Sequence, residues 1–190
     1  MPGTRVGFIG LGDMGAPIAQ CLLKAGFDVT VYDVREEAVL ALVDSGANRA
    51  GSPADVARRS ESIGICVVND VQLRDVFFGA EGLAPVLDAT KSVFVTSSVE
   101  PDAIKGIAAE VRDTGAAIVD APVSGSRPAA AAGTLTVLVG GSEADVARVM
   151  APIVASGSVA ISVWSVKSRS SGAMLKCTHT LSRTVSVCDT

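Results

Sequence analysis

Short apolar runs alternate with amphipathic segments along most of the chain. Runs that predict strands cover residues 5–9, 28–32, 48–50, 62–67, 92–96, 116–119 and 134–139. The run over residues 62–67 is almost continuously apolar, which is typical of a parallel strand buried on both faces. Strands that alternate with helical segments favour an α/β fold with a mainly parallel sheet.

Between these runs, apolar residues recur every three or four positions, the spacing of a helix with one buried face. The first such face holds Met14, Ile18, Leu22 and Ala25, with Gly26 ending the helix, and the second holds Val39, Leu42, Val43 and Gly46. Ser52 and Pro53 form a typical helix start, and Pro101 begins a helix that buries Ile104, Ile107, Ala108 and Val111. Ser142 caps a last helix with Val146, Val149, Met150, Ile153 and Val154 on its buried side.

The pattern changes from Ala155 onward, where serine becomes frequent and the helical period disappears. Residues 177–190 alternate with a period of two, which suits a strand or a frayed end. We therefore expect a folded domain over residues 1–163 and an irregular tail over residues 164–190. A shift of reading frame near residue 155, and again near residue 176, is one hypothesis for this change.

Composition narrows the class of protein. Of 190 residues, 48% are hydrophobic and 4% aromatic, so the chain can bury a sizeable core. A net charge of −4 without a basic cluster argues against a nucleic-acid partner. The four cysteines contain no C-x-x-C pair and there is one histidine, so we expect no metal site. With no secretory leader and no apolar run long enough to span a bilayer, we expect a soluble cytoplasmic protein without membrane contacts.

A glycine-rich stretch follows the first predicted strand and opens the first helix. It consists of Gly10, Leu11, Gly12, Asp13, Met14 and Gly15, and matches the G-x-G-x-x-G pattern. In a Rossmann domain the first glycine permits a tight turn, the second lets the backbone approach a diphosphate, and the third lets helix and strand pack closely. The amino end of the helix then offers N–H groups to phosphates. The stretch predicts a doubly wound Rossmann-type domain that binds a dinucleotide.

Asp33 follows the second predicted strand, where a carboxylate can accept hydrogen bonds from ribose hydroxyls and repel a 2′-phosphate. This position favours NAD as the cofactor. Arg35 lies two residues later and could instead hold a 2′-phosphate, so NADP remains possible.

Five segments in order resemble the β-hydroxyacid dehydrogenase family, which includes 3-hydroxyisobutyrate dehydrogenase. They are GFIGLGDMGAPIA (7–19), VVND (67–70), SSVEP (97–101), DAPVSGS (120–126) and GTLTVLVGG (133–141). The resemblance covers residues 5–154. It implies a small 3-hydroxy acid as substrate and hydride transfer to or from a nicotinamide cofactor.

The resemblance also implies site residues. Val67, Val68 and Ser98 would contact the cofactor, and they follow predicted strands at the rim where open α/β sheets bind ligands. Ser124, Gly125 and Ser126 would bind the substrate carboxylate, because a loop rich in serine and glycine exposes backbone N–H groups. Ser126 stands where the family usually has glycine.

In the segment GAMLK (172–176), Lys176 resembles the family's catalytic lysine, which would exchange a proton with the substrate hydroxyl. Thr180 stands where the family has an asparagine that orients the substrate, and Ser170 replaces an expected glycine. In this family a large all-helical domain should follow, supplying dimer contacts and one wall of the substrate cleft. We expect this chain to lack that domain, which leaves in doubt both its activity and the homo-oligomer implied for full-length members.

Two functions follow from the sequence. The first is an NAD(P)-dependent oxidoreductase of the 3-hydroxyisobutyrate dehydrogenase type. The second is a non-catalytic dinucleotide-binding module, a truncated or relict dehydrogenase. An imine reductase shares this amino-terminal architecture but generally lacks the lysine, so Lys176 argues against it.

Overall fold

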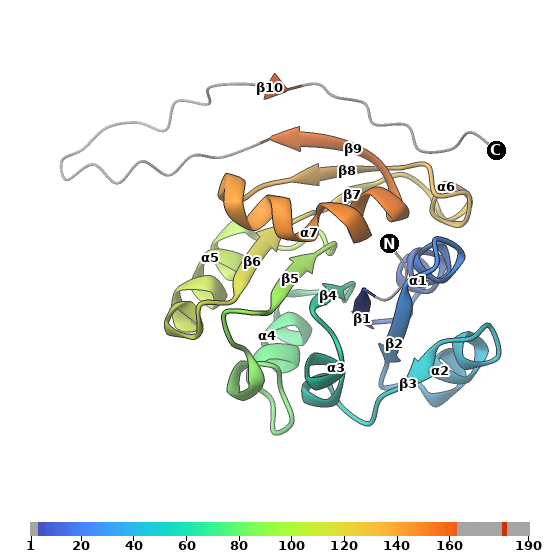
Figure 1. Ribbon diagram of the computed structural model, residues 1–190, viewed down its shortest axis with the longest axis horizontal. Helices are drawn as coiled ribbons and strands as arrows, with labels where there is room; N and C mark the ends of the chain where they lie inside the picture. Colours follow the sequence, from blue (N-terminus) through green and yellow to red (C-terminus); the bar gives the residue numbers. More distant parts are fainter. Residues whose placement is uncertain (1–3, 163–179, 182–190) are drawn as a thin grey trace.

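A six-stranded parallel sheet forms the centre of the computed structural model, which describes residues 4–162 and 180–181 (Figure 1). Its strands are β1 (Arg5–Ile9), β2 (Asp28–Tyr32), β3 (Asn48–Arg49), β4 (Ser62–Ile65), β5 (Ser92–Val95) and β6 (Ala117–Asp120). They lie in the order β3-β2-β1-β4-β5-β6. This is the strand order of a doubly wound Rossmann domain, so the predicted fold class is confirmed.

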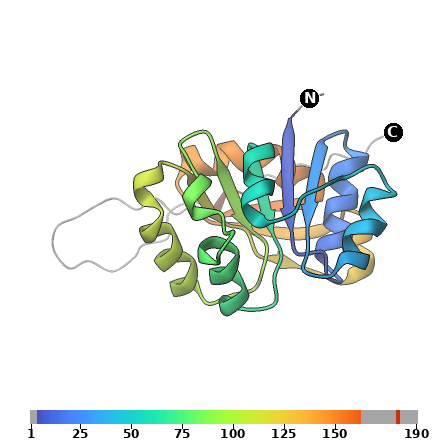
Figure 2. The same ribbon diagram turned by 90° about the horizontal axis from the view of Figure 1, so that it is seen from below.

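Helices cover both faces of the sheet (Figures 1 and 2). One face carries α1 (Gly15–Lys24), α2 (Glu36–Val43), α6 (Arg127–Ala131) and α7 (Glu143–Ser156), and the other carries α3 (Pro53–Arg59), α4 (Asp70–Phe78) and α5 (Pro101–Glu110). Two short 3-10 helices, η1 (Ala84–Val86) and η2 (Arg112–Thr114), lie in the connections. Ser52 caps α3 by accepting a hydrogen bond from the Asp55 N–H, as its sequence position predicts.

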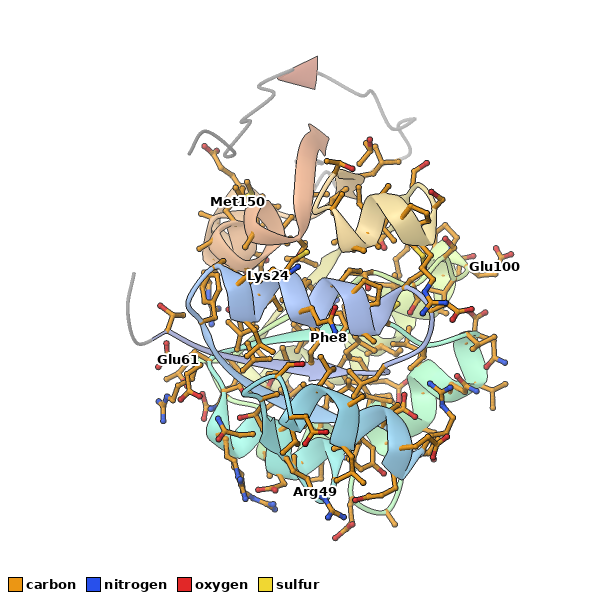
Figure 3. All side chains as sticks on the ribbon, turned by 90° about the vertical axis from the view of Figure 1, so that its right-hand side faces the viewer. Phe8, Lys24, Arg49, Glu61, Glu100 and Met150 are labelled. Carbon is orange, nitrogen blue, oxygen red and sulfur yellow. The ribbon has the colours of Figure 1, made fainter. Side chains whose placement is uncertain are left out.

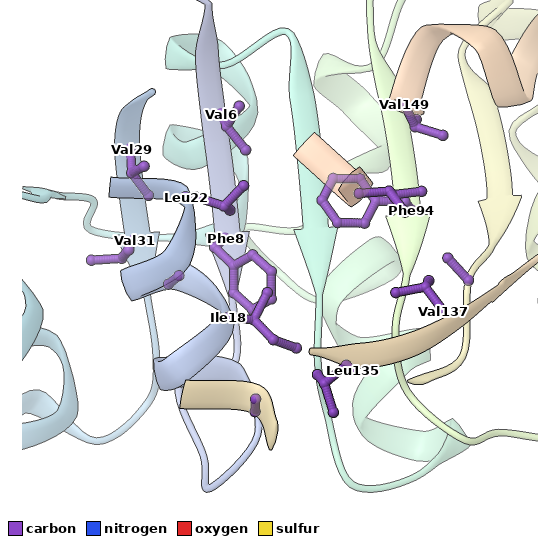
Figure 4. Packing of buried hydrophobic residues seen from close by; sticks show 14 of the residues in the cluster. Val6, Phe8, Ile18, Leu22, Val29, Val31, Phe94, Leu135, Val137 and Val149 are labelled. Atoms are coloured by element: carbon purple, nitrogen blue, oxygen red, sulfur yellow. The ribbon is translucent and has the colours of Figure 1, made fainter. Parts of the chain in front are cut away.

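The two faces of the central strands pack into different cores. Phe8 and Phe94 point toward α1 and α7, where they meet edge to face at 6.4 Å between ring centroids (Figure 4). Ile63 and Ile65 of β4 point the other way, toward α3, α4 and α5. Burial of β4 on both sides explains why its sequence is apolar without alternation.

A second sheet of four strands joins the first beyond β6 and lies at the top of Figure 1. It contains β7 (Val123–Ser124), β8 (Leu135–Val139), β9 (Gly157–Ser162) and β10 (Thr180–Leu181), in the order β10-β9-β8-β7. Asp120 and Gly140 link the two sheets by a pair of backbone hydrogen bonds. The predicted strand over residues 134–139 therefore exists, and it belongs to this second sheet.

Several elements are absent from the sequence-based prediction. Helix α4 has Leu73, Val76 and Phe77 at helical spacing and Asn69 as its cap. Both features are visible in the sequence and could have predicted this helix. Strand β9 lies where the periodicity indicated irregular structure. It forms because β8 offers a parallel edge along its whole length, a tertiary effect that local spacing does not reveal.

Candidate functional site

A cleft lies at the carboxyl ends of β1, β2 and β4, at the edge marked by Glu100 in Figure 3, while Glu61 marks the opposite edge. At this point the strand order reverses direction around β1, which is where open α/β sheets bind ligands. Its volume is about 530 Å³. The lining residues are Ile9, Gly10, Gly12, Asp13, Tyr32, Asp33, Val34, Arg35, Cys66, Val67, Val68, Gln72, Asp75 and Val76.

The three glycines of the turn after β1 have different structural roles. Gly10 has a φ of +89°, and a Cβ there would clash with the Cys66 carbonyl of β4's carboxyl end. A Cβ on Gly15 would clash with the Gly10 carbonyl, so this glycine allows α1 to approach β1. A Cβ on Gly12 would meet no atom within 4 Å. Gly12 therefore leaves open the face on which a ligand approaches the backbone.

Backbone donors gather at this turn. Within the described part of the chain, the N–H groups of Gly12, Asp13 and Met14 have no hydrogen-bond acceptor. They lie at the amino end of the ten-residue helix α1, which no side chain caps. Unpaired N–H groups and the helix dipole together favour an anion such as a diphosphate. The residues present therefore fit the phosphates of a dinucleotide.

Asp33 connects the end of β2 to the glycine turn. Its Oδ2 accepts a hydrogen bond from the Leu11 N–H at 2.6 Å, and its Oδ1 accepts one from the Arg35 N–H at 2.8 Å. Burial by itself would raise the pKa of Asp33, whose side chain is 7% exposed, but these bonds and the Arg35 guanidinium outweigh it and lower the pKa. Asp33 is thus a fixed carboxylate in the lining of the cleft.

Arg35 is held in place on the same network. Its guanidinium contacts the Asp33 carboxylate and donates to the Leu11 carbonyl at 3.1 Å. The hydrogen bond from Arg35 to Asp33 is the main cause of a raised pKa for Arg35, with smaller contributions from Glu37 and Asp13. Both predicted residues at the end of β2 thus lie together at the cleft.

The loop after β4 forms the opposite wall. The Val67 N–H donates to the Ser97 hydroxyl at 2.7 Å, and the Val68 N–H donates to Gln72 Oε1 at 3.0 Å. Val68 is 80% exposed and presents an apolar surface at the rim. Ser98 lies outside this cleft, in a neighbouring hollow that it shares with Val68.

Cys66 also lines the cleft. Burial raises the pKa of its thiol, and a smaller hydrogen-bond contribution from Thr96 opposes that rise. A thiol held in its neutral form is a poor nucleophile, so Cys66 serves here as a packing residue.

The loop predicted to bind the substrate carboxylate follows β6. Ser124 lies in β7, Ser126 precedes α6, and both are exposed. Gly125 has a φ of +143°, and a Cβ there would approach Leu135. These three residues are not among those that line the cleft beside Asp33.

Two predicted residues fall at the end of the chain. Lys176 lies outside the described residues. Thr180 is described by its backbone, which pairs with Ser162 where β10 runs antiparallel to β9. The expectations for both residues stay predictions.

Sequence reasoning missed Ser97 and Gln72, which fix the backbone of the loop after β4. Ser97 stands beside the predicted Ser98 in the SSVEP segment, and because β5 is buried along its whole length, no strand period distinguishes the two serines. Gln72 belongs to the first turn of α4, which was not predicted.

In the part of the chain that the structure describes, no group of three or more histidine, cysteine or acidic residues could hold a metal ion. The same residues include no helix with the length and apolarity needed to cross a bilayer. The cytoplasmic location expected from the sequence stays a prediction.

Comparison with known proteins agrees with this geometry. Residues 5–165 match the model of the NAD binding domain of 6-phosphogluconate dehydrogenase. The human mitochondrial 3-hydroxyisobutyrate dehydrogenase is 39% identical over 140 residues, which cover 74% of this chain and 42% of that protein.

Two solved structures are similar in fold. A 3-hydroxyisobutyrate dehydrogenase from Salmonella typhimurium has a TM-score of 0.78 at 33% identity, covering 84% of this chain and 56% of the other. Psf3 in complex with NADP+ and 2-OPP has a TM-score of 0.78 at 26% identity, covering 83% and 56%.

The chain spans about half the length of the relatives it matches. The matched half includes the glycine turn, Asp33 and the loop after β4, whose geometry fits a dinucleotide. The chain therefore belongs to the β-hydroxyacid dehydrogenase family and carries that family's NAD(P)-binding domain.

Proposed function

We propose that this chain is the cofactor-binding part of an oxidoreductase that transfers a hydride between a nicotinamide dinucleotide and a small 3-hydroxy acid. The observation that carries the proposal is the glycine turn at the switch point of the sheet, with unpaired N–H groups beside a fixed carboxylate. When bound, the dinucleotide supplies the carbon that accepts or donates the hydride.

In this proposal, residues of the chain bind the cofactor, bind the substrate and transfer the proton. The N–H groups of Gly12, Asp13 and Met14 bind the diphosphate, and Asp33 accepts hydrogen bonds from ribose hydroxyls. Exposed backbone groups around Ser124–Ser126 bind the substrate carboxylate. Lys176 takes a proton from the substrate hydroxyl during oxidation and returns it during reduction, as a general acid/base does.

NAD is the preferred cofactor in this proposal, because the pKa of Asp33 is lowered and its charge would repel a 2′-phosphate. Titration of the chain with NADH and with NADPH tests this preference. We expect the lower Kd for NADH, and a lower Kd for NADPH would contradict the assignment.

Turnover is tested with the same cofactors and a panel of 3-hydroxyisobutyrate, L-serine, glycerate and L-threonate. If the chain turns over one of these acids, Lys176→Ala should lower kcat by about 100-fold or more. Lys105→Ala removes an exposed lysine from α5 and serves as the matched control. Cofactor binding without turnover on any of the acids would instead support the non-catalytic module.

A further inference from the structure

The cofactor cleft carries an excess of negative charge on its own lining. Among the residues that line it, Asp13, Asp33 and Asp75 are acidic, and Arg35 is basic. Arg35 is already paired with Asp33. The dinucleotide brings a further two negative charges with its diphosphate, close to Asp13 in the glycine turn. A further cation beside this turn would therefore improve the electrostatic complementarity that the N–H groups and the helix dipole already provide.

Arg127 is placed to be that cation. Its Nη1 lies 3.9 Å from Oδ1 of Asp13, although the two residues are more than 100 positions apart in sequence. The side chain of Arg127 is 73% exposed and that of Asp13 is 87% exposed, so water screens the pair and it adds little to stability. Because this pair contributes little to folding, Arg127 is free to interact with a bound ligand.

The position of Arg127 is set by a buried contact rather than by the ion pair. Arg127 begins α6, and Ala130 in this helix is fully buried against α1. The Sγ of Cys21 in α1 donates to the Ala130 carbonyl at 3.4 Å. Helix α6 is thus fixed on the same helix whose amino end carries the glycine turn, and Arg127 lies within reach of Asp13 in that turn.

We propose that Arg127 is a cofactor-binding residue, which offsets the charge of Asp13 and attracts the dinucleotide diphosphate. Arg127 directly follows Ser126, so residues 124–127 would contact both the substrate carboxylate and the cofactor. The guanidinium donates to phosphate oxygens or forms an ion pair with Asp13, and in either case it reduces the repulsion that the diphosphate meets at the turn. The proposal rests on cofactor binding by this domain and not on turnover.

Fluorescence titration with NADH tests the role directly. At low salt, Arg127→Gln should weaken binding by roughly 3- to 10-fold, the effect of one exposed charge several ångströms from a dianion. The loss should shrink at high salt, where exposed charges are screened. Arg127→Lys keeps the charge and should recover most of the affinity, and Asp13→Asn should tighten binding.

Arg5→Gln is the matched control, since Arg5 is an exposed, ion-paired arginine at the amino end of β1, the far edge of the sheet. It should leave the Kd for NADH unchanged. An unchanged Kd for Arg127→Gln at low salt would overturn the proposal. So would an equal loss in Arg127→Lys with no dependence on salt, because that result indicates packing rather than charge. If the wild-type chain does not bind NADH, the cofactor assignment itself fails, together with the role of Arg127.

Discussion

Replacing Asp33 by asparagine tests the link between the glycine turn and β2. The carboxylate uses one oxygen for the Leu11 N–H and the other for the Arg35 N–H. An asparagine side chain has a single acceptor oxygen, so one of these two donors would face an NH₂ group instead. The substitution keeps the size of the side chain and removes its charge and one acceptor.

The expected cost follows mainly from the Leu11 N–H, because Leu11 is a buried residue, whereas the Arg35 N–H is exposed to water. Leaving a buried donor without its acceptor costs about 1–3 kcal/mol, and the remaining hydrogen bond loses its charge assistance. We expect Asp33→Asn to lower the free energy of unfolding by about 2 kcal/mol in total. For a domain of this size, that corresponds to a fall in Tm of roughly 4–8 °C.

The effect should also depend on pH. The folded state lowers the pKa of Asp33, so it favours the carboxylate more than the unfolded chain does. This stabilisation is complete above the ordinary pKa of 3.8 and is lost as the pH falls through the lower pKa of the folded state. The difference between wild type and Asp33→Asn should therefore be largest near neutral pH and shrink in acid.

Urea unfolding followed by far-UV circular dichroism measures both effects. Asp102→Asn makes the same chemical change at a side chain that is 94% exposed, and we expect no measurable loss of stability there. If Asp33→Asn unfolds at the same urea concentration as wild type, with the same slope, then the carboxylate does not hold the turn and the reasoning fails.

Two further predictions concern glycines. Gly12→Ala should leave the Tm almost unchanged, because its Cβ meets no atom within 4 Å. It should weaken NADH binding by about 10-fold or more, because the methyl group occupies the approach to the backbone. Gly15→Ala should lower the Tm instead, and a large loss of Tm in Gly12→Ala would contradict these separate roles. Gly106 lies inside α5, and a Cβ there would meet no atom within 4 Å. Gly106→Ala should therefore raise the free energy of unfolding, measured in a thermal or urea melt, by about 0.5–1 kcal/mol, and a decrease would show that the space is not open.

Local patterns in the sequence predict most of the first sheet. Strand β4 was recognisable because burial on both faces demands a continuous apolar run, and the turn at Gly10 because its backbone tolerates no side chain. Asp33 was identified by its place after β2. In each case the constraint restricts the residue type at one position or along one strand, so it leaves a visible mark in the sequence.

Features that depend on distant partners were not predictable in the same way. Strand β9 needs the edge of β8, and the contact between Arg127 and Asp13 needs α6 to pack on α1. The sequence also indicated Asp33 as a ribose ligand, but its hydrogen bond to Leu11 requires that two strand ends lie side by side. No spacing pattern in a single sequence indicates which distant residues come into contact.

The loop between β6 and β8 is held at both ends by main-chain atoms. Asp120 and Gly140 exchange backbone hydrogen bonds, and the Leu138 N–H donates to the Pro122 carbonyl at 3.0 Å. Such bonds do not depend on which side chains the loop carries, because every residue has a main-chain carbonyl. Evolution or an engineer could therefore exchange the side chains at positions 124, 126 and 127 as a cassette, changing what the loop recognises while the scaffold around it stays the same.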